Sequence, residues 1–234
     1  MTLLSNIIDN FDSNDNSSSI MICGGSIDNS NITRSIAFTL AYELAELNEA
    51  PLYICSDNIS TNFPDYITND DDDPTTSHWN LSILSRISMK YCNSYKELKQ
   101  VLVSLHAFHP SPSVIIIDNL INTTTTTTTT SSMSDILSIL SYIDDSMTYV
   151  TPKTNNNIKL IIADSTDRQF TPLYYRVVKY LLRLTEASSP SPPPPSSSGR
   201  GIASSSPRHT RPLSLTIETE QQRHSKFIQY VHKK

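Results

Sequence analysis

Two separated pieces of the chain carry residue types that hold phosphate and magnesium in nucleotide-binding proteins. The apolar run Val114–Ile117 suits a buried strand of a parallel sheet, and it ends in a carboxylate, Asp118. An acid at the carboxyl end of such a strand lies where ligands bind, and in nucleotide-binding folds it holds Mg²⁺. A second apolar run, Ile20–Cys23, is broken by Gly24 and Gly25. The two pieces predict either a nucleotide site or the scaffold of one.

The glycine stretch departs from the pattern of a phosphate-binding loop, which is GxxxxGK followed by Ser or Thr. In that pattern the glycines let backbone N–H groups turn toward the phosphates, and the lysine contacts the β- and γ-phosphates. This chain has a first glycine, at Gly24 or Gly25, but no second glycine and no lysine before the next predicted helix. Asp28 adds negative charge, and Arg34 comes about one helix turn too late. We therefore expect no ATP or Mg²⁺ cofactor, and we expect Asp118 to cap a neighbouring loop.

No other catalytic or metal-binding set is visible from the spacing of the residues. The chain has no GxSxG or HExxH motif, and its six histidines are scattered. We expect His106 and His109, near the end of a predicted helix, to contact helix carbonyls. Three cysteines without CxxC spacing, Cys23, Cys55 and Cys92, are expected to be small buried hydrophobes. The residues favour a protein that is not an enzyme.

Composition and charge narrow the class of protein further. Hydrophobic residues make up 37% and charged residues 18% of the 234 residues, both below globular averages of about 45–50% and about 25%. No apolar run approaches the roughly 18 residues of a membrane span, and the N-terminus lacks the features of a secretory signal. We expect a nuclear or cytosolic protein with an ordered core of roughly 150 residues.

The net charge of −5 is unevenly distributed along the chain. Residues 1–74 carry thirteen acids and one arginine, whereas residues 200–234 carry seven basic residues and two acids. A basic end can neutralise nucleic-acid phosphates, and the alternative is a solvated terminal hairpin. The candidate DNA-contacting residues are Arg208, Arg211, Arg223 and Lys226.

Apolar periodicity predicts alternating strands and helices, which indicates a doubly wound α/β sheet with helices on both faces. The predicted strands cover residues 20–23, 51–57, 87–91, 113–119 and 158–163. The predicted helices cover residues 33–47, 78–87, 94–108 and 133–147, followed by a segment, 173–182, that is helical or partly strand. A capping box, Ser94-x-x-Glu97, begins the third helix.

Tracts of low complexity divide the chain. We expect a flexible N-terminal segment, a core that contains two inserts, a disordered Pro/Ser loop, and C-terminal strands with a basic tail. Their bounds are 1–19, 20–187 with inserts at 57–77 and 122–132, 188–212, and 213–234.

The order of these pieces resembles the RecA-like recombinase family. The stretch ISMKYCNSYKELKQVLVSLHAFHPSPSVIIIDNL carries the likeness: an alternating strand, a polar turn, a helix that begins S-x-x-E-L, a Pro-Ser-Pro spacer, and an apolar strand ending in Asp-Asn-Leu. More narrowly, the chain is similar to the small RecA-like subunit of Shu-type complexes. The resemblance covers roughly residues 20–186.

The resemblance implies a RecA-like P-loop NTPase core with a C-terminal β-hairpin and a degenerate phosphate loop. Within it, phosphate-loop roles map to Gly25 and Thr33, and the Mg²⁺-binding acid maps to Asp118. It also implies a nuclear, non-catalytic accessory protein of homologous recombination, which binds single-stranded DNA and a SWIM zinc-finger partner and promotes recombinase filament assembly. Two alternatives stay open: a residual ATPase of the same fold, and a structural subunit of another assembly such as the Elongator subcomplex that modifies transfer RNA.

Overall fold

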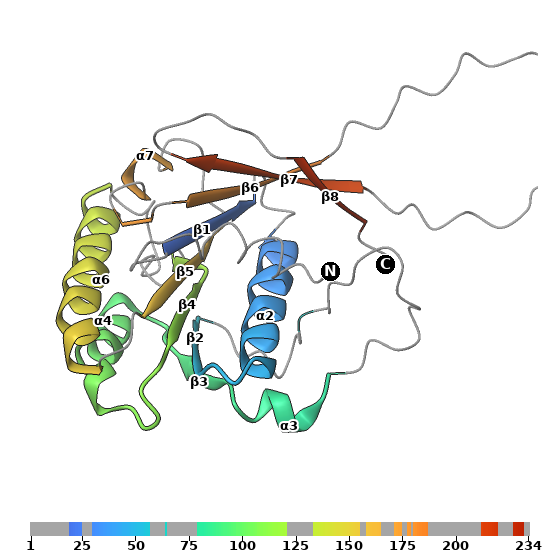
Figure 1. The fold of residues 1–234 in the computed structure, drawn as a ribbon. Helices are drawn as coiled ribbons and strands as arrows, with labels where there is room; N and C mark the ends of the chain where they lie inside the picture. The colour runs from blue at the N-terminus through green and yellow to red at the C-terminus, as the bar shows by residue number, and fades with distance from the viewer. Residues whose placement is uncertain are drawn as a thin grey trace, which may run out of the picture.

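A computed structural model describes residues 19–24, 30–56, 64, 79–120, 133–154, 158–164, 171–174, 177–178, 180–186, 212–219 and 227–231. Six parallel strands form the main sheet, in the order β3-β2-β4-β5-β1-β6 (Figure 1). They are β1 (Ser19–Gly24), β2 (Pro51–Cys55), β3 (Ser88–Tyr91), β4 (Val114–Asp118), β5 (Lys159–Asp164) and β6 (Tyr180–Glu186). Two further strands, β7 (Pro212–Thr219) and β8 (Phe227–Val231), pair antiparallel beyond β6.

The strand order places β5 between the first strand and the strand that carries Asp118. This order differs from the two common doubly wound orders, 3-2-1-4-5-6 and 2-1-3-4-5, in which the first strand has other neighbours. Because the strands are parallel, their carboxyl ends share one edge of the sheet. The ends of β1, β4 and β5 therefore lie side by side there.

The central strands form because their residues are apolar on both faces. Every residue of β2 and β4 is buried, and the two strands pair in register from Pro51 opposite Val114 to Cys55 opposite Asp118. After Asp118 the backbone turns through Asn119, at φ 60°, and the Asn119 N–H donates to the Ala163 carbonyl at 2.7 Å. This turn ends β4 beside β5. The predicted buried strands are confirmed.

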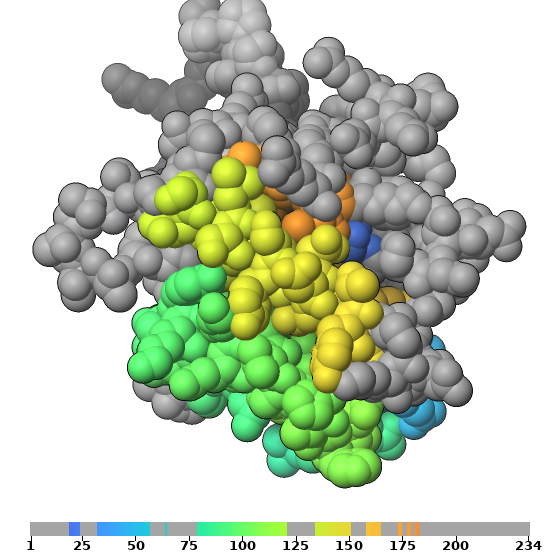
Figure 2. Space-filling model, turned by 90° about the vertical axis from the view of Figure 1, so that its left-hand side faces the viewer, coloured from blue at the N-terminus to red at the C-terminus, as the bar shows by residue number. Residues whose placement is uncertain are grey.

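Helices cover both faces of the sheet, as predicted. α2 (Ser30–Glu46) packs on one face, where α3 (Leu81–Leu84) contacts it. The opposite face is covered by α4 (Tyr95–Val103), η3 (Leu105–Ala107), α6 (Met133–Thr154) and α7 (Thr171–Tyr174). Figure 2 shows α4 and α6 side by side on that second face, in green and yellow. Each face has its own buried apolar cluster, so the sheet lies between two cores.

Two helices have bounds that differ from the predicted ones. α2 begins at Ser30, one turn earlier than predicted, and ends at Glu46, so Leu47 is 63% exposed instead of joining the buried face. α6 continues to Thr154, although we expected it to end at Met147 and a loop to follow. The reason is that Val150, at 1% exposure, continues the buried stripe by another turn.

Three shorter segments also differ from expectation. The predicted helix over 78–87 is the single turn of α3, and its Asn80 side chain accepts a hydrogen bond from the Ser82 N–H. α4 ends at Val103, before the prolines that we expected to stop it, and η3 follows. Segment 173–182 is divided between α7 and β6, a strand that we did not separate from the helix. β6 pairs with β1 and extends the parallel sheet.

Several predicted segments fall outside the described residues. They are most of segment 1–19, almost all of the two inserts at 57–77 and 122–132, and the Pro/Ser loop apart from Pro212. Among the residues that the structure does describe, no helix combines the length and apolar character that crossing a membrane requires.

Neighbouring residues in α4 give a matched test of this packing. Leu102 is 1% exposed and Val103 is 53% exposed, so only Leu102 lies in the core. We expect Leu102→Ala to lower the free energy of unfolding by about 2–5 kcal/mol, because it leaves a cavity. Val103→Ala should change it by less than about 0.5 kcal/mol. Urea unfolding measures both values, and equal losses would contradict this placement of α4.

Candidate functional site

Three of the predicted nucleotide-site residues lie in the described part of the chain. Asp118 is the last residue of β4 and is 3% exposed, and Gly24 is the last residue of β1. Thr33 lies in the first turn of α2 and is 2% exposed. Gly25 lies outside the described residues. The four candidate DNA-contacting residues also lie outside them: Arg208, Arg211, Arg223 and Lys226.

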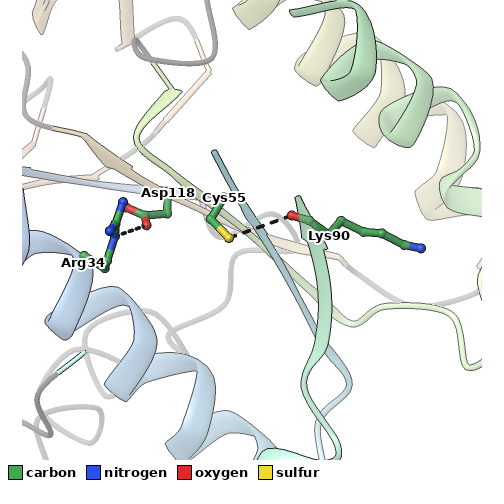
Figure 3. A network of polar contacts seen from close by, with 4 residues as sticks. All are labelled: Arg34, Cys55, Lys90 and Asp118. Atoms are coloured by element: carbon green, nitrogen blue, oxygen red, sulfur yellow. Dashed lines mark hydrogen bonds and ion pairs between the residues drawn. The ribbon is translucent and has the colours of Figure 1, made fainter. Parts of the chain in front are cut away.

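Asp118 forms a buried ion pair with an arginine of helix α2. The Arg34 Nε donates to Asp118 Oδ2 at 2.7 Å, and the side chains are 11% and 4% exposed (Figure 3). A hydrogen bond of this length between two ionised groups is about twice as strong as a neutral one. Our sequence interpretation dismissed Arg34 as too late to meet phosphates and missed that it meets the acid.

The position of Arg34 on α2 explains this contact. Arg34, Phe38, Ala41 and Ala45 recur at helical spacing, and all are buried, so Arg34 is the polar end of an apolar stripe. α2 follows the carboxyl end of β1, so its first turns lie at the same edge of the sheet as the end of β4. The guanidinium therefore reaches Asp118 although 84 residues separate the two along the chain.

Two β2 residues lie beside this pair. The Tyr53 hydroxyl is buried and makes no hydrogen bond to any residue that the structure describes. Burial raises the pKa of Tyr53 well above its usual range, the nearby Asp118 raises it further, and Arg34 opposes this. Cys55, which pairs with Asp118 across the strands, contacts the Lys90 carbonyl through Sγ at 4.0 Å. Figure 3 shows the Lys90 side chain extending away from the ion pair.

A second buried acid ends the neighbouring strand β5. Asp164 is 1% exposed, and the Tyr174 hydroxyl donates to its Oδ2 at 2.6 Å. Tyr174 and its neighbours belong to the core on the α6 side, whereas Arg34 reaches Asp118 from the α2 side. Burial and then the Asp164 charge raise the pKa of Tyr174 well above its usual range. Sequence reasoning missed Asp164 as a site residue, although the run Ile161–Ala163 before it has the same apolar pattern that singled out Asp118.

These residues do not fit the Mg²⁺ of a bound nucleotide. Mg²⁺ takes carboxylate oxygens as ligands, but the Asp118 carboxylate here binds a guanidinium, whose positive charge disfavours a second cation at the same place. Within the described ranges, no cluster of three or more His, Cys, Asp or Glu side chains is arranged to hold a metal ion. The Arg34–Asp118 contact joins α2 to the end of β4.

The remaining sequence predictions about single residues have clear outcomes. His106 Nδ1 lies 3.0 Å from the Val103 carbonyl, which confirms the expected contact of this histidine with its helix end. For His109 the same expectation stays a prediction. Cys23, Cys55 and Cys92 are all reduced and buried, as expected, and burial raises the pKa of Cys92 to about 11.

Comparisons with known proteins do not assign this chain to a family. No protein-family model matches the chain, and no curated protein sequence matches it. The candidate site is therefore defined by the two buried acids and by the groups that contact them.

The Arg34–Asp118 pair can be tested with a double-mutant cycle. Arg34→Met leaves a buried carboxylate without its cation, so we expect it to cost about 3–5 kcal/mol of unfolding free energy. The double variant Arg34→Met/Asp118→Leu should lose less unfolding free energy than the sum of the losses in the two single variants. Lys159→Met is the matched control, because its 3.9 Å pair with Glu49 is one-third exposed and such pairs contribute about 1 kcal/mol or less. Strictly additive losses in urea unfolding would contradict the pairing.

Two fully buried tyrosines give a second matched test. At neutral pH we expect Tyr174→Phe to cost about 1.5–3 kcal/mol, because it removes a hydrogen bond to a carboxylate. Tyr53→Phe should cost less than Tyr174→Phe, since the Tyr53 hydroxyl makes no hydrogen bond to a residue that the structure describes.

The pH dependence of the same variants follows from the raised pKa values. Both hydroxyls keep their protons more tightly in the folded state, so their contribution to stability is complete below about pH 10 and decreases as the pH rises above that value. Tyr53→Phe should therefore lose less stability than the native protein between pH 9 and 11. Thermal unfolding across that range measures this, and an unchanged alkaline loss would contradict the burial of Tyr53.

Proposed function

We propose that this protein is a non-catalytic, RecA-like accessory protein of homologous recombination. In this proposal it acts in the nucleus, binds single-stranded DNA and a SWIM zinc-finger partner, and promotes assembly of a recombinase filament during double-strand break repair. The RecA-like identity of the core, including a C-terminal hairpin formed by β7 and β8, is part of the proposal.

Two features of the sheet support a RecA-like core. One strand, β5, separates the first strand from the strand that ends in Asp118, so the end of β1 and this acid lie one strand apart on the same edge. The first strand leads into α2 at the carboxyl edge, where such proteins have their phosphate loop. The sequence resemblance over residues 87–120 is independent of this strand order and favours the same family.

The Arg34–Asp118 pair is the observation on which the non-catalytic role depends. A buried guanidinium beside the strand-end acid already supplies the positive charge that this acid would otherwise take from Mg²⁺. Together with the missing lysine and second glycine of the loop, the pair favours a core that keeps its shape without nucleotide. Such a core is suited to holding partners in place.

The DNA-binding part of the proposal depends on charge. Residues 200–234 carry seven basic residues in a chain whose net charge is −5, so cations are concentrated at one end. Lysine and arginine that neutralise phosphates release counterions, which makes binding sensitive to salt.

A titration of the full-length protein with a fluorescent single-stranded oligonucleotide, between about 50 and about 200 mM salt, tests DNA binding. Replacing Arg208, Arg211, Arg223 and Lys226 with Gln should reduce the slope of log affinity against log salt by about 3, since each phosphate contact contributes about 0.7. Lys159→Gln, on β5, is the control for loss of a single charge elsewhere. Tighter binding to transfer RNA than to single-stranded DNA would contradict the proposal and favour an RNA-modifying assembly.

The partner is tested separately by affinity purification of the tagged protein from its own cells. We expect a protein with a SWIM zinc-finger to co-purify in stoichiometric amount. Recovery of a stoichiometric partner without that domain would contradict a Shu-type role.

A further inference from the structure

The end of the sheet formed by β3 and α4 is basic in an acidic chain. Residues 79–112, all described, contain four basic side chains and one acid, so this block has a net charge of +3 while the whole chain has −5. The acid, Glu97, accepts a hydrogen bond from the Asn93 N–H at 2.8 Å as part of the helix cap. One basic residue, Arg86, donates to the Ala45 carbonyl and to Asn48 on the α2 side. Three lysines remain on the α4 side: Lys90, Lys96 and Lys99.

Aromatic rings hold two of these lysines in place of carboxylates. The Lys90 Nζ lies 5.4 Å from the centroid of the Phe108 ring, and the Lys99 Nζ lies 4.3 Å from that of Tyr142. Both distances are within the range of cation–π contacts. Among the residues that the structure describes, no carboxylate forms an ion pair with Lys90, Lys96 or Lys99. Their charges are therefore available to an outside anion.

The three lysines lie on one face of the molecule. Lys90 pairs with Ile54, whose side chain belongs to the core under α4, so Lys90 projects from the α4 side of the sheet. Lys96 and Lys99 are three residues apart on α4 and share one side of that helix. Figure 2 shows this face, on which α4 and α6 lie open to the viewer.

The same face carries an exposed aromatic pair beyond the lysines. Tyr149 on α6 is 55% exposed, and its ring packs edge-on against exposed His106, with the centroids 6.5 Å apart. α6 also carries three exposed acids, Asp135, Asp144 and Asp145. Asp145 comes three residues after Tyr142 and four before Tyr149, so it lies on the same side of α6 as these rings and would repel a phosphate bound there. Proteins bind a single nucleic-acid strand through cations that neutralise its phosphates and aromatic rings that stack on its bases, and this face carries residues of both kinds.

We propose that this β3–α4 surface, defined by Lys90, Lys96, Lys99, His106 and Tyr149, is a binding site for single-stranded nucleic acid. The proposal deepens the DNA-binding part of the proposed function and adds a site distinct from the basic C-terminal residues. An acidic protein segment would satisfy the lysines alone, whereas the exposed Tyr149–His106 pair favours unstacked bases.

The test uses the full-length protein and a fluorescent oligo-deoxythymidine strand, with polyglutamate in a parallel arm. Lys90→Gln/Lys96→Gln/Lys99→Gln should reduce the salt slope by about 2, at about 0.7 for each phosphate contact. Tyr149→Ala should weaken binding at least about five-fold through lost stacking. Tyr91→Ala is the matched control, because Tyr91 is also exposed, at 46%, but follows Lys90 in β3 and so projects from the opposite face of the sheet.

A gain of affinity separates binding from folding defects. Asp144→Asn/Asp145→Asn removes repulsion beside α4, so it should tighten binding of the oligonucleotide, which a misfolded variant would not do.

An unchanged salt slope in the triple lysine variant would overturn the inference. Polyglutamate binding that equals oligonucleotide binding in affinity and in sensitivity to the lysine variant would overturn it as well. If the C-terminal variant alone loses binding, this surface is not the site, while the proposed function stands. If the lysine variant alone loses binding, the surface is supported and the C-terminal assignment fails.

Discussion

The buried contact between Arg34 and Asp118 determines what the carboxyl edge of this sheet can do. Burying two charges carries a large desolvation cost, so such a pair is weak evidence for net stability, whereas removing one of its partners is strongly destabilising. Each charge requires the other, since either one alone would be left uncompensated in an apolar site. The pair therefore joins α2 to β4 in one orientation, and the apolar stripe that starts with Arg34 packs accordingly.

The second acid of this edge is satisfied in a different way. Asp164 accepts a hydrogen bond from Tyr174 on the opposite side of the sheet, so a neutral hydroxyl contacts one acid and a guanidinium contacts the other. The edge at which parallel sheets place their ligands thus holds acids that contact the protein's own side chains. Among the residues that the structure describes, lysines that form no ion pair with a carboxylate lie on the β3–α4 surface.

The parallel sheet could be predicted because its strands are continuous apolar runs between polar or glycine-containing turns. The two ends of α2 could not, because no local signal marks Ser30 or Glu46 as a helix end. The end of α6 could not, because Val150 is included by packing and not by a local signal. β6 was not separated from the helix before it, and segment 173–182 was predicted as helical or partly strand, since Leu181 and Leu182 fit a helix as well as a strand when only their apolar character is considered. The Arg34–Asp118 pair was also missed: each residue could be read alone, but their contact depends on the β1-β5-β4 strand order, which no local pattern specifies.

Isothermal titration of Mg²⁺–ATP into the full-length protein tests the central claim most directly. If Arg34 already supplies the positive charge beside Asp118, no saturable heat of binding will be seen at nucleotide concentrations up to about 1 mM, the upper range of ordinary enzyme substrates. Saturable binding in the micromolar range that is lost when Asp118 is replaced by Asn would contradict the account. It would show that the acid exchanges its arginine for a metal ion and that the chain is a nucleotide-binding protein.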